Sequence, residues 1–349
     1  MTTIEGKLVR GLGRAAEFTR IDSVRQQLIA LAGIDPHPGT LNLLLDGEHN
    51  RRVWRRWRAL PGQAMRAAEP AFCNARCYPA RIAGNIPAAV IVPEVAGYPD
   101  DKLELVAALP LRQHLLLEEG ALLKVELCRP LVAAAVLFDI DGTLVDSAQA
   151  YLEVARVAAA PHGLLVTEQH VRNSLAGGSN FWKDVVPRDR PDYQVILKSM
   201  AAHAAKEWPR ILRAQGQVFA GVAQSLAALK QLGLALGIVS GAHPAVLELL
   251  RANDILHLFD AIVLGSDVAR PKPDPQGILK CLAQMGIAPA AAIYVGDTPI
   301  DIQTSRAAGV GSIGVLTGAG SSASMSAQAP DRLIYSHASL AQCIKPGQE

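Results

Sequence analysis

Acidic side chains occur in pairs at two places in the second half of the chain. Asp139 and Asp141 directly follow an apolar run, and Asp297 and Asp301 follow another. Two carboxylates that point into one pocket repel each other when both are ionised, and a nearby cation relieves that repulsion. Mg²⁺ is a hard cation that prefers carboxylate oxygens. The pattern therefore predicts a magnesium site.

A hydroxyl and an amine lie at comparable places in the chain. Ser240 and Gly241 end a third apolar run, and Lys272 lies beyond a fourth. Lysine and hydroxyl groups suit the oxygens of a phosphate. A single acidic pair is more often a solvated loop or a helix cap. That alternative is weak here, because four such groups follow four predicted strands in order.

The elements that must position these groups are short apolar runs between helical stretches. Continuous runs typical of buried parallel strands occur at 133–138, 234–239, 261–264, 291–295 and 311–316. The alternation predicts an α/β fold with a doubly wound parallel sheet, which binds ligands at the carboxyl ends of its strands. The segment from about 146 to 217 contains no convincing strand, which predicts an inserted helical cap.

The motifs of this half resemble those of the haloacid dehalogenase-like (HAD) superfamily. "VLFDIDGTLVDS" is similar to its first motif, "GIVSG" to the second, "ARPKPDP" to the third and "YVGDTPIDIQTSRAAG" to the fourth. The cap resembles the helical type of the phosphoglycolate phosphatase-like branch. The resemblance implies a HAD-like hydrolase at 130–349, with its core at 130–146 and 217–349 and its cap at about 147–216.

The resemblance implies a phosphatase that acts on a small phosphorylated metabolite. Asp139 would be the nucleophile that forms an aspartyl-phosphate. Asp141 would protonate the leaving alcohol and then accept a proton from water. Superfamily members with an Asp at this second position favour phosphatase chemistry, and the dehalogenases lack it.

The resemblance also implies which groups hold phosphate and metal. The phosphate-binding groups would be Thr143, Ser240, Gly241 and Lys272. Mg²⁺ would be bound by Asp139, by the backbone carbonyl of Asp141 and by Asp297. Asp301 would assist through water or by orienting Lys272.

One segment of the cap allows two interpretations. Gly177–Asn180, with Trp182 and Lys183 nearby, looks like the substrate-facing loop of such a cap. An ordinary turn between two helices explains the same residues equally well.

The first half of the chain has a Pro- and Gly-rich turn before a short predicted strand at 41–45. After this turn, Thr40 and Asn42 alternate onto one face of the strand. A hydroxyl and an amide oxygen there would complete a Mg²⁺–phosphate site whose charge comes mostly from a nucleotide. Gly11 and Gly13 are a weaker signal, since a tight turn explains them. Other short runs, with one helix at 23–31, predict a small β-barrel with strands at 4–9, 88–92, 103–107 and 122–127.

This half resembles the archaeal-type CTP-dependent riboflavin kinase family, a cradle-loop β-barrel, over about residues 4–127, which implies a barrel domain at 1–129. The motifs are "GKLVRGLG", "PHPGTLN", "CYPARIAGNIPAAVIVPE" and "LELVAALPLRQHLLLEEG". The resemblance implies that riboflavin is phosphorylated to FMN by CTP. It places nucleotide near Gly11 and Gly13, metal and nucleotide at Thr40 and Asn42, and flavin contacts at Glu104 and Arg112.

The barrel departs from the family pattern in two places. The family usually has Gly-Asp where this chain has Gly120 and Ala121, and residues 14–17 are only loosely similar. A fold survives such changes more readily than an activity does. The barrel is therefore either an active riboflavin kinase or a non-catalytic flavin- or nucleotide-binding module that regulates the phosphatase.

The sharpest run of charge is Arg51–Arg58, which includes Trp54 and Trp57. Basic and aromatic residues together can bind nucleic acid. They can equally cover a barrel with the tryptophans buried, or help to bind an anionic nucleotide. The formal net charge of +2 gives no support to a nucleic-acid partner.

Composition sets further bounds on the kind of protein. With 50% hydrophobic and 19% charged residues, the 349-residue chain is not a disordered protein, and its length suits two domains. The longest apolar run, near 131–138, is too short to span a bilayer, and residues 1–10 lack a signal-peptide pattern. The five cysteines fit a reducing cytosol better than a disulfide framework.

Joining the two halves predicts a phosphate of flavin metabolism as the phosphatase substrate. Making and hydrolysing FMN on one chain would be futile unless it were regulated. A phosphorylated ribityl-pyrimidine precursor is therefore favoured slightly over FMN itself.

Overall fold

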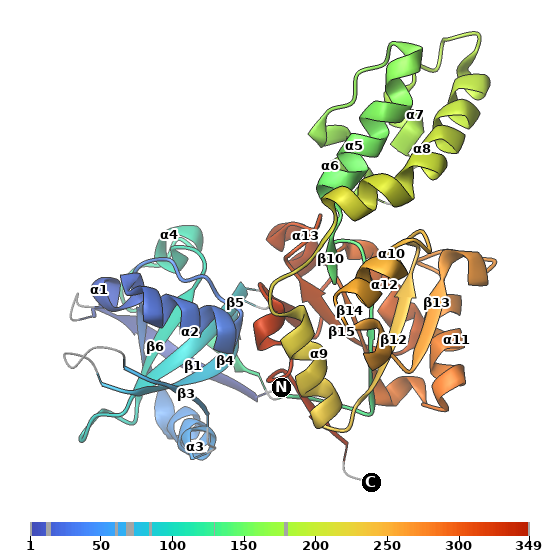
Figure 1. Cartoon of the computed structure of the whole chain (residues 1–349). Coiled ribbons are helices and arrows are strands. Elements are labelled where there is room, and N and C mark those ends of the chain that lie inside the picture. Colours follow the sequence, from blue (N-terminus) through green and yellow to red (C-terminus); the bar gives the residue numbers. More distant parts are fainter. Residues whose placement is uncertain are drawn as a thin grey trace. The chain divides into compact units, whose positions relative to one another are not determined.

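Figure 1 shows the computed structural model of the chain, which describes residues 2–11, 15–59, 62–67, 73–83, 86–128, 130–177 and 181–347. The chain forms two compact units. The first consists of Met1–Leu131 with Ile334–Cys343, and the second of Val132–Leu333 with Ile344–Glu349. Each unit is described by itself below.

The first unit is built on an antiparallel β-barrel. Neighbouring strands follow the order β3-β4-β5-β6-β2-β1-β7, and β4 also pairs with β7, which closes a barrel of six strands with β3 beside it. The strands are β1 (Thr2–Val9), β2 (Leu41–Leu45), β3 (Gln63–Met65), β4 (Ala75–Ile82), β5 (Ile86–Pro93), β6 (Lys102–Ala107) and β7 (Leu122–Leu127). The predicted small barrel is confirmed.

Alternation along β1 shows why these residues form a barrel wall. Ile4 and Leu8 are each 1% exposed and lie in the barrel core, whereas Glu5 and Lys7 between them are not buried. Side chains on a strand point alternately to its two faces, so one face fills the interior. The sequence analysis missed β4, whose Pro79 sits in mid-strand.

Four helices belong to the barrel unit: α1 (Ala15–Arg20), α2 (Asp22–Ala32), α3 (Gly47–Arg58) and α4 (Leu111–His114). Trp54 and Trp57 of α3 pack into the barrel core. Arg55 forms ion pairs with Glu48 and Asp100. This arrangement favours the barrel-covering interpretation of the arginine-rich run over nucleic-acid binding.

The second unit is built on a six-stranded sheet in the order β13-β12-β9-β14-β15-β16, in which the first five strands are parallel. The strands are β9 (Ala135–Phe138), β12 (Ala235–Ser240), β13 (Ala261–Leu264), β14 (Ala292–Gly296), β15 (Gly311–Val315) and β16 (Arg332–Ile334). The predicted parallel sheet is confirmed, with β9 at its centre.

Helices follow the strands of this sheet: α9 (Val222–Gln231), α10 (Val246–Ala252), α11 (Gln276–Met285), α12 (Pro299–Ala308) and α13 (Ser322–Ala327). Ala135 and Leu137 share a core cluster with apolar residues of α11 and α12. Phe138 faces the opposite side of the sheet, where its ring meets that of Phe259 edge-on at 6.1 Å. A strand buried on both faces explains the continuous apolar run.

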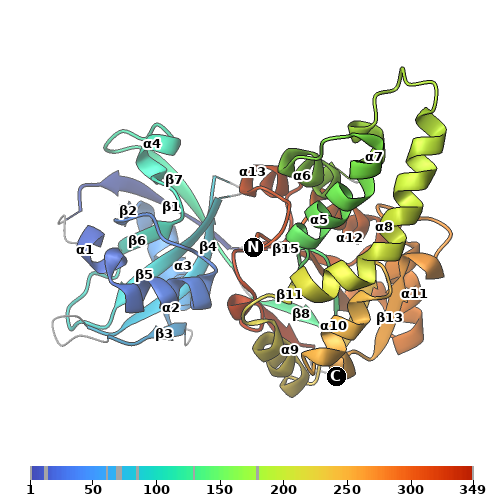
Figure 2. The ribbon, with the colours of Figure 1, turned by 45° about the horizontal axis from the view of Figure 1, so that its top comes forward.

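Between β9 and β12 the chain forms a helical cap with its own apolar core (Figure 2). Its helices are α5 (Ala148–Ala159), α6 (Glu168–Gly177), α7 (Phe181–Val185) and α8 (Tyr193–Gln215). A short antiparallel pair, β10 (Val145–Asp146) with β11 (Gln217–Val218), joins the two stems of the cap. Residues 178–180 of the predicted substrate-facing loop lie outside the described part of the chain.

The last part of the chain returns to the barrel unit. The segment Ile334–Cys343 packs there on α2, and the N–H of Tyr335 donates to the carbonyl of Gly33 at 3.2 Å. Gly33 ends α2 with a φ of 66°, and a Cβ there would lie 3.0 Å from Ser339 Oγ. Glycine suits both requirements. Beyond this segment, β17 (Ile344–Pro346) pairs with β8 (Leu131–Ala133).

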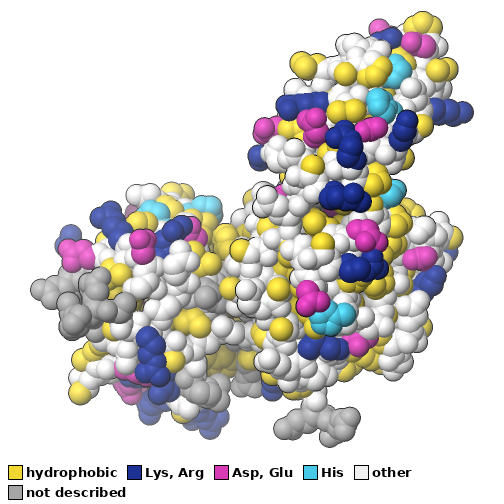
Figure 3. All heavy atoms as spheres, in the orientation of Figure 1, with side chains coloured by type: hydrophobic (Ala, Val, Ile, Leu, Met, Phe, Trp, Pro, Cys, Tyr) yellow, Lys and Arg dark blue, Asp and Glu magenta, His cyan; other side chains and the backbone are white. Residues whose placement is uncertain are grey.

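Figure 3 shows Lys and Arg side chains mixed with acidic ones over the visible face. Such a surface gives no extended basic path on this face for a nucleic-acid backbone. Among the described residues, no helix is both long and apolar enough to cross a membrane.

Candidate functional site

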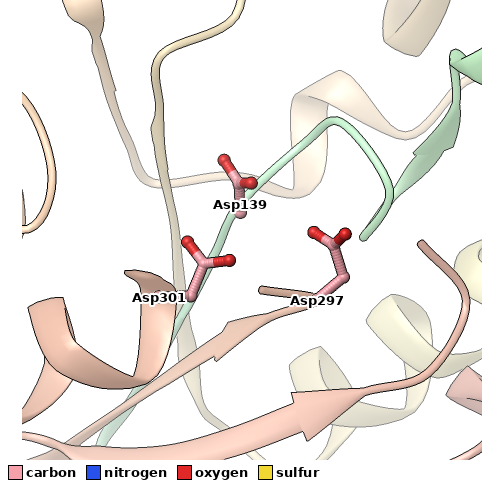
Figure 4. Close-up of side chains that lie close together, drawn as sticks. All are labelled: Asp139, Asp297 and Asp301. Carbon is pink, nitrogen blue, oxygen red and sulfur yellow. The ribbon is translucent and has the colours of Figure 1, made fainter. Parts of the chain in front are cut away.

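Three carboxylates converge at the carboxyl edge of the parallel sheet (Figure 4). Asp139 directly follows β9, Asp297 follows the neighbouring β14, and Asp301 lies in the first turn of α12. One oxygen from each lies within 4.8 Å of the others. All three residues are buried, at 7%, 1% and 0% exposure. Parallel pairing of β9 with β14 brings the two strand ends together, as predicted from the motif positions.

The electrostatics of this cluster favour a bound cation. Burial raises the pKa of Asp139 to about 6, with Lys272 opposing the rise and Asp301 adding to it. Burial, followed by repulsion from Asp301 and Asp139, also holds the pKa of Asp297 well above its usual value. A divalent cation would offset both burial and repulsion. Carboxylate oxygens are the ligands that Mg²⁺ prefers, so the cluster fits that ion.

Two glycines approach the Asp297 carboxylate so closely that no side chain fits at their positions. A Cβ on Gly142 or on Gly318 would overlap that carboxylate. Thr143 Oγ1 donates to Asp297 Oδ1 at 3.1 Å, and the N–H of Ala319 donates to Oδ2 at 2.9 Å. These contacts fix the side chain in one orientation. Thr143, predicted to hold phosphate, thus places its hydroxyl on Asp297.

Lys272 connects two of the acidic residues. Its Nζ lies 3.0 Å from Asp139 Oδ1 and 2.7 Å from Asp301 Oδ1. Burial lowers the pKa of Lys272, but Asp139 and Asp301 outweigh it and hold that pKa well above its ordinary value. The amine is therefore a fixed positive charge beside the Asp139 carboxylate.

Tyr294 is a supporting residue that the sequence analysis missed. Its hydroxyl donates to the carbonyl of Val239 at 2.7 Å and accepts from Lys272 Nζ at 3.2 Å. It lies in β14 among apolar residues and is fully buried. Its position two residues before Gly296 gave no signal, because an aromatic residue in a buried strand is usually only part of the core.

Asp141 lies on the cap side of the site. Its carboxylate accepts hydrogen bonds from Ser147 Oγ at 2.7 Å and from the hydroxyl of Tyr151, in α5, at 3.0 Å. Burial raises the pKa of Asp141, and these two hydroxyls oppose the rise. The sequence analysis did not single out Ser147 or Tyr151.

A cavity of about 660 Å³ opens above these residues. Its lining includes Asp139, Asp141, Ser240, Gly241, Lys272 and Asp297. The motifs from four strand ends therefore face one cavity. Such a cavity can hold a phosphate group beside a carboxylate, a lysine and a second carboxyl group.

The barrel unit has a cavity of about 800 Å³ of its own. The predicted residues on its lining are Gly11, Thr40, Asn42, Glu104 and Arg112. Gly13 lies outside the described residues. Of the predicted N-terminal site residues, those that the structure describes thus share one cavity.

Gly11 and Asn42 lie side by side in this cavity. β1 pairs with β2 so that Val9 is opposite Asn42, and a Cβ on Gly11 would overlap the Asn42 amide nitrogen. Asn42 Nδ2 lies 3.4 Å from Thr40 Oγ1, to which it donates. The glycine is needed here for close approach.

Glu104 is held by two neighbours. It accepts from the hydroxyl of Tyr98 at 2.9 Å and from Lys102 Nζ at 2.8 Å. Burial, followed by the charge of Glu104, raises the pKa of Tyr98, which keeps that phenol protonated as a donor. Neither Tyr98 nor Lys102 was singled out from the sequence.

Family models divide the chain at the same place as the motifs. Residues 136–315, just over half of the chain, match the model of the haloacid dehalogenase-like hydrolases. Residues 8–127 match a model named for CTP-dependent riboflavin kinase and described as a domain of unknown function. Both resemblances noted in the sequence are thereby confirmed.

Curated relatives cover the second unit. The phosphoglycolate phosphatase of Escherichia coli O157:H7 is 34% identical over 221 residues, which are 57% of this chain and 87% of the relative. The phosphoglycolate phosphatase of Salmonella choleraesuis strain SC-B67 is 32% identical over 221 residues, which again are 57% of this chain and 87% of the relative.

Solved structures show the same fold. A Bacteroides fragilis protein described as a haloacid dehalogenase-like hydrolase has a TM-score of 0.54 and 28% identity, and it covers 61% of this chain and 100% of its own. A haloacid dehalogenase-like family hydrolase from Streptococcus pneumoniae has a TM-score of 0.52 and 20% identity, with 60% and 97% covered. The family model, the relatives and the placement of the motifs agree, and the chain belongs to the haloacid dehalogenase-like hydrolase family.

Proposed function

We propose that the second unit hydrolyses a small phosphomonoester through an aspartyl-phosphate on Asp139. The observation that carries the proposal is the convergence of Asp139, Asp297 and Asp301 with Lys272 in one buried cluster at the floor of a cavity. Mg²⁺ would be held by Asp139, Asp297 and the backbone carbonyl of Asp141, and would neutralise charge on the phosphate oxygens.

In the first step, an Asp139 carboxylate oxygen attacks phosphorus and the bond to the substrate's alcohol oxygen breaks. Asp141 gives its proton to that oxygen, so that a neutral alcohol leaves. The raised pKa of Asp141 suits this role, because it keeps more of the carboxyl protonated near neutral pH. Lys272 and Ser240 hold the non-bridging oxygens while charge builds on them.

In the second step, water attacks the aspartyl-phosphate. Asp141, now ionised, accepts a proton from the water, and the bond between phosphorus and the Asp139 oxygen breaks. Inorganic phosphate leaves and both carboxyl groups return to their starting states. Tyr294 keeps Lys272 in place throughout.

The test traps the covalent intermediate. The Asp141→Asn variant, mixed with acetyl phosphate and Mg²⁺ and quenched in acid, is expected to gain one phosphoryl group in its mass spectrum. Mapping should place the group on the peptide that contains Asp139. A double variant that adds Asp139→Asn is the control and should gain none; equal labelling of both would overturn the proposal.

For the barrel, we propose phosphorylation of riboflavin to FMN by CTP. Support comes from Gly11, Thr40 and Asn42, which share one cavity with Glu104 and Arg112. The alternative is a non-catalytic flavin- or nucleotide-binding module. The bonds from Tyr98 and Lys102 both go to Oε1 of Glu104, so they do not distinguish a kinase from a binding module.

The kinase test uses the full chain with Asp139→Asn, so that any FMN formed is not hydrolysed at the other site. Incubation with riboflavin, CTP and Mg²⁺ is expected to yield FMN, measured by chromatography. Adding Asn42→Ala should abolish that yield. Riboflavin or CTP binding without any FMN would instead support the binding module.

A further inference from the structure

A second cavity lies beside the catalytic one and is walled by the cap and the core of the second unit. It encloses about 450 Å³. From the cap, its walls include Tyr151, Val154, Leu175, Trp182, Ala205 and Trp208. From the core come residues 241–244 and 265–266, which follow β12 and β13.

The two cavities are adjacent and share part of their lining. Both are lined by Tyr151, Leu175 and Gly241. Ser240 and Lys272, which are placed to hold the phosphate, line the catalytic cavity and not the second one. The group that leaves with the alcohol oxygen is therefore the part of the substrate that reaches the second cavity.

The two cavities differ in chemistry. The catalytic cavity carries charged cap and core residues, among them Glu168, Arg172 and Arg270. The described residues that line the second cavity include no Lys, Arg, Asp or Glu. Its one histidine, His243, uses Nδ1 to accept the N–H of Ala245 at 3.1 Å. The site therefore changes from polar to apolar with distance from the phosphate.

Aromatic side chains give the apolar cavity its shape. Tyr151 and Trp208 pack against each other with ring centroids 4.4 Å apart, and Trp182 lies on the same lining. Aromatic walls bind flat aromatic ligands by stacking and by burial of apolar area. Among the described residues, arginines line only the catalytic cavity, so a short carboxylate such as glycolate would meet none of these cations in the second cavity.

We propose, on the basis of the phosphatase function proposed above, that the substrate is the phosphomonoester of an alcohol whose far end is a flat, uncharged aromatic ring system. A polar chain joins phosphate to ring and passes Arg172. A flavin phosphate has this order of groups, and the barrel's riboflavin kinase resemblance provides an independent reason to use FMN as the probe.

The experiment measures kcat/KM for FMN, phosphoglycolate and acetyl phosphate with Mg²⁺ and without CTP. Acetyl phosphate has a leaving group too small to reach the apolar cavity. The unmodified protein is expected to prefer FMN over phosphoglycolate by about tenfold or more. A bulky charged side chain inside the cavity should remove this preference, because it fills the space that the ring needs and loses water when the ring enters.

Ala205→Arg introduces that charge from an exposed position on α8. It is expected to lower kcat/KM for FMN by about tenfold, mostly through KM, and to leave acetyl phosphate hydrolysis within about twofold. Ala202→Arg is the matched control, since Ala202 is exposed on the same helix and does not line the cavity. It should change kcat/KM for neither FMN nor acetyl phosphate.

Two results would overturn the proposal while sparing the phosphatase function. One is a higher kcat/KM for phosphoglycolate than for FMN. The other is an Ala205→Arg variant in which kcat/KM falls equally for all three substrates or does not change for any of them. If the unmodified protein hydrolyses acetyl phosphate no faster than the Asp139→Asn variant does, the phosphatase function itself is wrong. Activity of Ala205→Arg on acetyl phosphate also shows that the variant is folded.

Discussion

Asp141 receives hydrogen bonds from Ser147 and Tyr151, which stand where the core passes into the cap. Both hydroxyls donate to the carboxylate and so stabilise its ionised form. The protonation state of the proposed acid is thus set by residues at the base of the cap. Motion of α5 relative to Asp141 would change that state, which links substrate enclosure to proton transfer.

Removing one of these bonds should shift the pH profile. In Tyr151→Phe the carboxylate loses a donor, so the pKa of Asp141 rises further above its usual value. Because the first step needs protonated Asp141, the alkaline limb of kcat/KM should move to higher pH. The maximum rate should fall by about tenfold, the lower end of the value of one hydrogen bond to a charged group.

The matched control for this change is Tyr193→Phe, which removes a phenol hydroxyl elsewhere in the cap. Its pH profile should coincide with that of the unmodified protein. An alkaline limb that stays in place in Tyr151→Phe would show that the hydroxyl does not act on Asp141.

The acidic cluster predicts a stability that depends jointly on pH and Mg²⁺. The pKa of Asp139 is about 6 in the folded protein against 3.8 for the free group, so the fold favours the protonated form. Its contribution to stability is present at low pH and is lost as pH rises through about 6. Mg²⁺ would bind the ionised form and should then restore that stability.

Thermal unfolding with and without Mg²⁺ measures this effect. The rise in Tm caused by Mg²⁺ should be larger at about pH 8 than at about pH 5, where protons compete with the ion. Asp297→Asn should lose most of the rise at both values. An equal rise at both pH values in the unmodified protein would contradict the argument.

Single residues of the site differ in how far the sequence could reveal them. Asp139, Asp141 and Asp297 stand directly after or near the ends of apolar strands, so strand topology alone brings them together. Tyr294 and Tyr151 act through contacts that depend on the packing of β14 and α5, which residue types do not encode. The motif placed Thr143 near the site, but only the structure shows that its hydroxyl donates to Asp297.

At the scale of elements, β1 and β2 build the barrel cavity by their register. The close approach of Gly11 to Asn42 leaves no room for a side chain. Gly11→Ala should push the Asn42 amide away from Thr40 and lower the affinity for CTP by about tenfold, in line with the cost of overpacking. Titration calorimetry with CTP measures this whether the barrel is a kinase or a binding module.

Gly347→Ala is the matched control, because a Cβ there would make only an ordinary contact, 3.7 Å from Val132. Its affinity for CTP should equal that of the unmodified protein. Unchanged affinity in Gly11→Ala would mean that nucleotide does not contact Asn42.

The sequence predicted strands correctly where both faces of the strand are buried. The runs at 261–264 and 311–316 became β13 (Ala261–Leu264) and β15 (Gly311–Val315), because strands buried on both faces need continuous apolar sequence. β4 was missed since Pro79 and Arg81 interrupt its pattern. The helix expected at 23–31 is present as α2, which begins one residue earlier, at Asp22.

At the scale of the whole molecule, the barrel unit includes the late segment Ile334–Cys343. No sequence pattern indicated this, since Tyr335 and Gly33 meet across almost the whole chain. Leu340 in that segment is fully buried. Leu340→Ala should therefore destabilise the barrel by about 2–5 kcal/mol, the usual cost of a large-to-small change in a core.

The measurement follows Trp54 and Trp57, which are buried in the barrel, in a background with Trp182→Phe and Trp208→Phe. Their denaturation midpoint should fall in Leu340→Ala. Lys345→Ala, at an exposed position just beyond the segment, is the control and should leave it unchanged. An unchanged midpoint in Leu340→Ala would show that the segment does not support the barrel.

The return of residues 334–343 also orders events during synthesis on the ribosome. The barrel strands emerge first, yet the piece that packs on α2 is translated after the hydrolase strands. A nascent chain can form the β-barrel early, but it reaches the final state of that unit only after the hydrolase strands have been made. A premature stop codon shortly before position 334 would thus leave the barrel unit unfinished, although its strands are made before those of the hydrolase.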